Sequence, residues 1–176
     1  MTTQTIYFRG SRDDVRKLLR QVPRALAGKD GDPTGAVRDL QLAAGMTALS
    51  LIKDAFVQKA RGGTDAAGDS WAPLADSTKR KKRRRGNPEI LRDTGVLLNS
   101  LSPGVSVPGQ VLEVHPGEVI VGTNVPYAPF IHLGTPRMPA RPLWPSPEKW
   151  PSEWWSLILR KVQEGTLRLL MRLFNH

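Results

Sequence analysis

The segment AVRDLQLAAGMTALSLIKDAFVQKA, residues 36–60, decides the fold because its apolar residues recur at helical spacing. The main stripe consists of Val37, Leu40, Ala44, Ala48, Leu51 and Ala55, and it is widened by Leu42, Leu49, Ile52 and Phe56. A helix with so wide an apolar face is buried on more than one side. We therefore expect one long helix that other elements cover on several sides.

Two segments downstream of this helix predict the sheet. QVLEV (Gln110 to Val114) and EVIVG (Glu118 to Gly122) are rich in β-formers, and His115-Pro116-Gly117 between them is a hairpin signal. VSV, at Val105 to Val107, has a similar composition. The fold class expected from these patterns is α+β, with the long helix packed across a small antiparallel sheet.

Further elements are expected toward both ends of the chain. Thr5 to Gly10 predicts a short strand, and residues 11–26 predict an N-terminal helix. Residues 152–174 predict an amphipathic helix whose apolar stripe consists of Trp155, Ile158, Val162, Leu169 and Leu173. We expect one α+β domain over residues 1–150 and a C-terminal amphipathic helix within 151–176.

A proline-rich segment, residues 124–147, lies before the C-terminal helix. Its seven prolines predict that regular structure cannot run through it. Its apolar residues are Tyr127, Phe130, Ile131, Leu133, Met138, Leu143 and Trp144, so we expect it to be pinned against the sheet. The cluster of Trp144, Trp150, Trp154 and Trp155 is interpreted as a hydrophobic anchor. Together with the proline-rich segment it is a candidate subunit contact, because Trp is favoured at interface hot spots.

Composition excludes several classes of function. The 176 residues contain no cysteine, so disulfides, thiolate zinc sites and cysteine nucleophiles are excluded. The start of the chain lacks the apolar core of a signal peptide, and we found no apolar stretch near the roughly 18 residues that span a bilayer. The expectation is a protein used in a cytoplasm, with no membrane partner.

The net charge of +10 is mostly local, because seven of the 26 basic residues form one uninterrupted run. The run consists of Lys79, Arg80, Lys81, Lys82, Arg83, Arg84 and Arg85. Mutual repulsion, with Gly86 and Pro88 just beyond, predicts a flexible, exposed and irregular loop over 79–88. The run lacks aromatic residues for base stacking, yet it could hold phosphates by charge. Acidic patches on neighbouring proteins and DNA both remain candidates, and acidic protein is preferred because a strong grip would hinder sliding DNA.

Signatures of an enzyme are poor. His115, His132 and His176 lack the spacing of metal ligands, and no nucleotide-binding loop or nucleophile elbow occurs. Residues 30–41 match a calcium loop at only Asp30, Asp32 and Gly35, and we interpret them as a turn leading into the long helix. No catalytic residue, cofactor or metal is therefore expected, although a hydrolase with an unmarked site stays an alternative.

Four short motifs follow one another in the second half of the chain. The first consists of Gly68, Trp71, Pro73, Leu74, Thr78 and Lys79, and the second of Leu91, Thr94, Gly95 and Leu97. The third consists of Val121, Gly122, Thr123, Tyr127, Ala128, His132 and Gly134, and the fourth is Pro-Ala-Arg-Pro, which includes Arg141 and Pro142. This order, over about residues 68–145, resembles the virion morphogenesis or tail completion proteins of tailed phages, including Mu-like phages.

The resemblance implies a structural protein without enzymatic activity. Such proteins are virion components at the neck or the head-proximal end of the tail, assembled in the host cytoplasm. They form rings, commonly six-fold, around the path of the DNA. The implied partners are other copies of this chain, neck, connector or tail proteins, and the DNA itself. Tyr127, His132 and Arg141 are then structural or interface residues. The alternative function is a nucleic-acid-binding module that uses residues 79–85.

Overall fold

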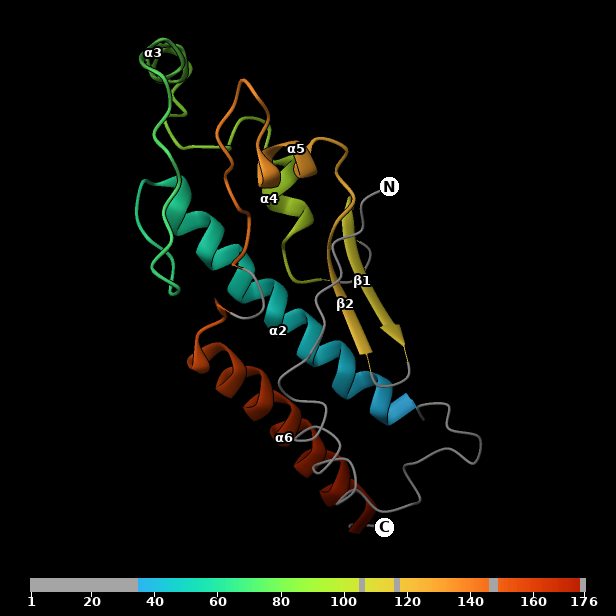
Figure 1. Ribbon diagram of the computed structural model, residues 1–176. Helices are drawn as coiled ribbons and strands as arrows, with labels where there is room; N and C mark the ends of the chain where they lie inside the picture. Colours follow the sequence, from blue (N-terminus) through green and yellow to red (C-terminus); the bar gives the residue numbers. More distant parts are fainter. Residues whose placement is uncertain (1–34, 105–106, 116–117, 146–148, 175–176) are drawn as a thin grey trace.

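The computed structural model describes residues 35–104, 107–115, 118–145 and 149–174 (Figure 1). The expected strand at 5–10, the expected helix at 11–26 and most of the third β-like segment lie outside these residues. The elements, in chain order, are α2 (Gly35–Ala60), α3 (Asp76–Arg84), α4 (Val96–Ser100), β1 (Gln110–His115), β2 (Glu118–Thr123), α5 (Ala128–Leu133) and α6 (Ser152–Phe174).

The α+β fold expected from the sequence is confirmed, with α2 at its centre. Figure 1 shows α2 running between the β1–β2 hairpin and α6, and α2 contacts both. Leu49, Ile52 and Phe56 are fully buried because neighbours cover the helix on more than one side. The width of the apolar stripe in residues 36–60 therefore reports a helix with two covered faces.

Two glycines allow these close approaches. A Cβ on Gly45 would lie 2.6 Å from Leu112 Cδ1 on β1 and 2.8 Å from Val119 Cγ1 on β2. A Cβ on Gly165 of α6 would lie 2.5 Å from Leu40 Cδ2 on α2. The backbone of α2 can thus approach the hairpin, and that of α6 can approach α2, only because no side chain stands at these positions.

The sheet is a two-stranded antiparallel hairpin. Gln110 pairs with Thr123 and His115 pairs with Glu118, which gives an unbroken register. Val119 and Val121 alternate along β2 and are buried toward α2, as the two-residue period of a strand requires. A hairpin alone is only marginally stable in water, so packing against α2 stabilises this sheet.

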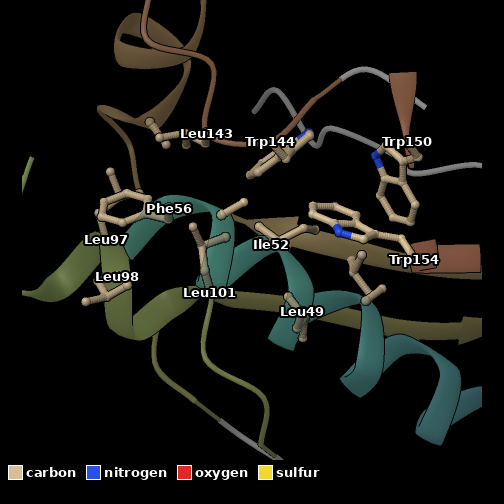
Figure 2. Packing of buried hydrophobic residues seen from close by; sticks show 14 of the residues in the cluster. Leu49, Ile52, Phe56, Leu97, Leu98, Leu101, Leu143, Trp144, Trp150 and Trp154 are labelled. Carbon is tan, nitrogen blue, oxygen red and sulfur yellow. The ribbon is translucent and has the colours of Figure 1, made fainter. Parts of the chain in front are cut away.

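The core continues from α2 to α4 and to the tryptophans near α6. Figure 2 shows leucines of α4 and the indoles of Trp150 and Trp154 gathered around side chains of α2, and all belong to one buried cluster. Ser100 at the end of α4 makes a buried hydroxyl–hydroxyl hydrogen bond of 2.8 Å to Thr123 of β2. This contact fastens α4 to the hairpin without leaving a buried hydroxyl unpaired.

The basic run is helical, so the expectation of an irregular loop was wrong. Helix α3 spans Asp76–Arg84 and carries six of the seven basic residues, while Arg85 stands at its C-cap. The exposure that we expected is confirmed, because none of its residues is buried. An acid in the first turn and cations in the last turn both suit the helix dipole. Gly86 then ends the helix with a φ of 69°.

A second correction concerns the proline-rich segment, which contains helix α5. Pro129 lies in the first turn of α5, where a proline ring fits and no helical N–H is lost. The helix stops at Gly134, whose φ is 78°. Pro129 is therefore compatible with a short helix in this segment.

Helix α6 lies where the sequence predicted it, but its buried face is shifted. Trp154, Ile158, Val162 and Thr166 are buried, whereas Trp155 is only half-buried. The stripe that we assigned through Trp155 was therefore displaced by one residue at its start. The side chains of Leu169 and Leu173 lie outside the described set.

Over Val37–Ala60, α2 is long and apolar enough to cross a membrane, judged by length and composition alone. Our expectation that no such stretch exists was therefore wrong. Core helices of globular proteins have the same composition, and α2 packs against both the hairpin and α6. Its length and composition are thus weak evidence for a membrane span.

Candidate functional site

A buried ion pair lies at the C-terminal end of α2. Lys59 Nζ is 2.8 Å from Asp65 Oδ2, and both side chains are 0% exposed. Lys59 Nζ also donates a hydrogen bond of 3.0 Å to the carbonyl oxygen of Pro142, and it lies 5.4 Å from the centre of the Trp71 ring. The ammonium is therefore surrounded by a carboxylate, a carbonyl and an aromatic face, all of which favour a cation.

Asp65 organises the turn that follows α2. Its Oδ1 accepts hydrogen bonds of 3.0 Å from the backbone N–H groups of Ala67 and Asp69. Gly68 completes the turn with a φ of 81°. The Asp65 carboxylate thus fixes the loop through Oδ1, as in an Asx turn. Its other oxygen, Oδ2, faces Lys59 and supplies the buried counter-charge.

The first and fourth sequence motifs hold each other through their backbones. Trp71 Nε1 donates to the carbonyl oxygen of Pro142 at 2.8 Å. In return, Arg141 donates from Nε and Nη2 to the carbonyl oxygen of Ala72, at 3.2 and 3.1 Å, and from Nη2 to that of Pro73 at 3.3 Å. Arg141 is buried, and this burial lowers the pKa of its guanidinium from the ordinary value. Two segments about seventy residues apart are therefore clamped by reciprocal contacts.

His132, from the third motif, joins the same cluster. Its Nδ1 accepts a hydrogen bond of 3.1 Å from the backbone N–H of Leu143, and its ring centre lies 5.1 Å from that of Trp144. Burial, and then the charge of Lys59, lower the pKa of His132 below its ordinary value. The neutral imidazole is the form that this hydrogen bond requires, and its proton then sits on Nε2.

Gly134 is the position at which the third motif turns toward the fourth. A Cβ there would lie 2.6 Å from the backbone nitrogen of Ala140, and the φ of 78° also favours glycine. The backbone N–H of Arg141 donates to the carbonyl oxygen of Ile131 at 2.8 Å, which closes the turn. The contacts of His132 and Arg141 are therefore those of structural residues.

The structure brings together only part of the predicted set. Pro142 and Trp71 contact Lys59 of the Lys59–Asp65 pair. Arg141 bonds to Pro73, His132 bonds to Leu143, and Gly134 lies against Ala140, so these residues join the pair through the segment 140–143. We call Lys59, Asp65, Trp71, Pro73, His132, Gly134, Arg141 and Pro142 the motif cluster. Thr94 and Gly95 lie elsewhere, where Gly95 has a φ of 80° and caps α4. Leu74 packs against the main core, and Tyr127 is exposed beside α5.

Sequence reasoning missed Lys59 and Asp65. A signal was present, because Lys59 lies three residues after Phe56 and seven after Ile52, on the face that those residues bury. A lysine at a core position, with an acid six residues later, indicates a buried pair.

The tryptophan cluster also needs a correction. Trp144, Trp150 and Trp154 are buried, and the Trp150 indole donates to the carbonyl oxygen of Pro145 at 3.1 Å. Trp150 and Trp154 stack edge to face at a centroid distance of 5.3 Å. These three side chains are therefore core residues of this chain and not exposed subunit contacts, and only Trp155 is half-buried.

Exposed apolar side chains lie instead on α5. Phe130 is 61% exposed and Leu133 is 66% exposed, and Tyr127 precedes them at the start of the helix. Leu167 and Met171 form a second exposed pair, one turn apart on α6. The α5 residues belong to the proline-rich segment that we considered for subunit contact.

Helix α3 forms the basic surface. Figure 1 shows it standing away from the body of the molecule, at the end of two extended connections. Lys82 Nζ donates to the carbonyl oxygen of Arg92 at 2.9 Å, and Arg85 pairs with Asp93 at 3.8 Å. The helix is therefore fastened to the following turn at its C-terminal end, while its other basic side chains face solvent.

The described residues contain no group of three or more His, Asp or Glu side chains that could hold a metal ion. Comparisons with protein-family models, with curated proteins and with solved structures found no match for this chain.

Proposed function

We propose that this chain is a structural protein of a tailed-phage virion, placed at the neck or the head-proximal end of the tail. In this proposal it has no enzymatic activity. Several copies, most simply six, form a ring around the path of the DNA and contact neck, connector or tail proteins.

The observation that carries the proposal is the motif cluster. The motifs resemble those of tail completion proteins in type and order, and three of their side chains, those of Trp71, Arg141 and His132, bond to the segment of another motif. The Trp71 indole donates to the carbonyl oxygen of Pro142, the Arg141 guanidinium donates to that of Ala72, and His132 accepts from the backbone N–H of Leu143. Residues that clamp distant segments are needed for a fold, so a shared fold would explain why these motifs occur together.

Two exposed surfaces suit a ring subunit. Phe130 and Leu133 on α5 present apolar area, and α3 presents charge. If the apolar surface meets a different patch of the next copy, the contact is head-to-tail, and such contacts close into rings when the rotation allows. The apolar surface suits contact between copies, and the basic surface suits contact with an anionic neighbour.

The test is made on particles of the phage or prophage that encodes the chain. We expect the chain in purified virions, at a copy number that fits a cyclic ring. Deleting the gene should leave filled heads and finished tails that remain separate in electron micrographs. Absence from virions, or one copy per virion, would overturn the proposal.

A nucleic-acid-binding module is the second candidate, and α3 is the observation that favours it. Its basic side chains are exposed on a regular element, as in proteins that bind phosphates. This function predicts salt-sensitive binding of DNA by a monomeric chain that is absent from particles. Presence in virions as a ring would reject it in favour of the first proposal.

A further inference from the structure

The helical form of α3 gives the basic run a definite geometry. At about 100° per residue, the exposed basic residues fall into three ridges of i, i+4 pairs. The ridges consist of Lys79 with Arg83, Arg80 with Arg84, and Lys81 with Arg85. Lys82 marks the side that faces the body, because it donates to the carbonyl oxygen of Arg92. The ridge of Arg80 and Arg84 therefore points away from the body, with one basic ridge on each flank.

Among the described residues, only polar contacts hold this helix: Lys79 pairs with Asp76 at 3.3 Å, and Lys82 and Arg85 contact the turn that follows. It has nine residues, whereas isolated helices need about 12–15 residues to be stable in water. None of its residues is buried, and Ala75 at the N-cap makes no side-chain hydrogen bond. Each ridge is a like-charge pair at i, i+4, which opposes the helix. An anion that neutralises the ridges would therefore strengthen the helix.

We propose that α3 is a docking helix for duplex DNA and that contact with phosphates stabilises its helical form. The outer ridge enters the major groove, and the two flanking ridges face the phosphates on the two walls. Binding and helicity are linked, because a ligand that binds only the helical form shifts the population toward that form.

Duplex DNA fits this distribution of charge better than an acidic protein face does. A helix with its side chains is about 10–12 Å across, and the major groove is about 12 Å wide. A groove offers anions on both sides of an inserted helix, whereas a flat acidic face meets one or two ridges and leaves the third in solvent. The basic stretch has no Asn or Gln with which to read adenine, although Arg80 and Arg84 on the outer ridge can contact guanine. We expect phosphate contacts from the flanking ridges to supply most of the affinity.

The inference rests on the proposed function only for the source of the DNA, which crosses the proposed ring. The two can fail separately. If the chain is present in virions but DNA does not slow hydrogen exchange in α3, this inference is wrong and the proposed function stands. If DNA slows hydrogen exchange in α3 but the chain is absent from virions, the proposed ring is wrong and this inference stands.

The first experiment is hydrogen exchange of the full chain, read by mass spectrometry, with and without a mixed-sequence DNA duplex. We expect slower exchange in peptides that cover residues 76–85 and no change in peptides from α2. Six phosphate contacts give a log–log salt slope of about −5, or roughly a thousand-fold loss of affinity between about 50 and 200 mM salt. Unchanged exchange in α3 at low salt would overturn the proposal.

A matched pair of triple variants tests whether DNA binding depends on the charges of α3 or on the total charge of the chain. R80Q/R83Q/R84Q removes three charges from α3, and R160Q/K161Q/R168Q removes three exposed charges from α6. We expect the first to weaken DNA binding at low salt by at least ten-fold more than the second. Equal losses would show that the total charge, and not α3, binds the DNA.

A second pair tests the helix itself. Lys81→Pro breaks the middle of α3, while Lys81→Gln removes the same charge and keeps the helix. We expect the Pro variant to bind DNA several-fold more weakly than the Gln variant, with the same Tm for the domain. Equal affinities would overturn the helical docking.

The hydrogen-exchange experiment is repeated with poly-L-glutamate of matched charge in place of DNA. Protection of α3 equal to that by DNA would favour an acidic protein as the partner and overturn the assignment to DNA.

Discussion

Lys59 is the single residue on which the motif cluster most depends. It places a charge in the core, and Asp65 is its only carboxylate within the described ion pairs at that site. We expect Asp65→Asn to lower the free energy of unfolding by about 3–5 kcal/mol, because it leaves a buried ammonium without a counter-charge. The measurement is urea unfolding of the single variant beside wild type.

The matched control is the double variant Lys59→Met/Asp65→Asn. It removes both charges, and the Asn side-chain oxygen can still accept from the loop N–H groups of Ala67 and Asp69. We expect it to be more stable than the single variant, because it no longer buries a charge without a counter-charge. A single variant within 1 kcal/mol of wild type would contradict the importance of the pair.

His132 gives the cluster a pH dependence whose sign can be worked out. Burial, and then Lys59, lower its pKa in the folded chain below the ordinary value of 6.5. Below pH 6.5 the unfolded chain therefore binds a proton that the folded chain does not. The free energy of unfolding should fall as pH drops from 6.5 toward the folded pKa, and this group adds no pH dependence above 6.5. His132→Asn keeps an acceptor but cannot titrate in this range, so a fall as steep as that of wild type would contradict the role of His132.

At the scale of elements, the close contacts at Gly45 and Gly165 differ in how far the neighbouring side chains can move. A Cβ on Gly45 would press on Val119, whose branched side chain is stiff, as well as on Leu112. A Cβ on Gly165 would meet only the terminal methyl of Leu40, which can rotate away. We expect Gly45→Ala to lower Tm, because overpacking of about 1–3 kcal/mol exceeds the helix gain of about 1 kcal/mol. Gly165→Ala should be close to neutral, and the reverse order of the two Tm values would contradict this view of the packing.

The elements that the sequence predicts are those whose apolar pattern continues over many residues. Residues 36–60, the hairpin over 110–123 and residues 152–174 repeat their apolar pattern for several turns or along whole strands, and all three were predicted. Helix α3 was missed because charge repulsion was weighed without the helix dipole and the hydrogen bonds near Lys82. Helix α5 was missed because Pro129 was read as a breaker, although a proline in the first turn of a helix is favourable.

The candidate site was only partly predictable for a different reason. Trp71, His132 and Arg141 could be named from motifs, because the motifs are local. Their partners are backbone carbonyls and N–H groups far along the chain, and no side-chain pattern marks these. Lys59 was hidden because a lysine is normally exposed, and only its place in the stripe of Phe56 shows that it is buried.

At the scale of the whole molecule, the core is closed on several sides, and exposed side chains gather on α3, α5 and α6. The hairpin and α6 lie along α2 (Figure 1), and the contacts of Lys59 with Asp65 and Pro142 close its C-terminal end. The basic ridges of α3 and the apolar side chains of α5 lie outside this core. In the proposed virion, we assign contact with neighbours to α3 and α5, which are short elements set between irregular segments.

The last prediction concerns assembly through α5. Phe130→Glu/Leu133→Glu places two charges on exposed positions, so the monomer should keep its Tm. If α5 joins neighbouring copies, each lost hot-spot residue of about 2 kcal/mol weakens the contact roughly 30-fold, and two charges should prevent ring formation. The readout is the copy number of the chain in virions produced with the variant gene.

Leu167→Glu/Met171→Glu on α6 is the matched control, because it removes a similarly exposed apolar pair and should leave the copy number unchanged. Normal incorporation of the α5 variant would show that another surface joins the copies, and loss with both variants would show that exposed apolar area in general is required.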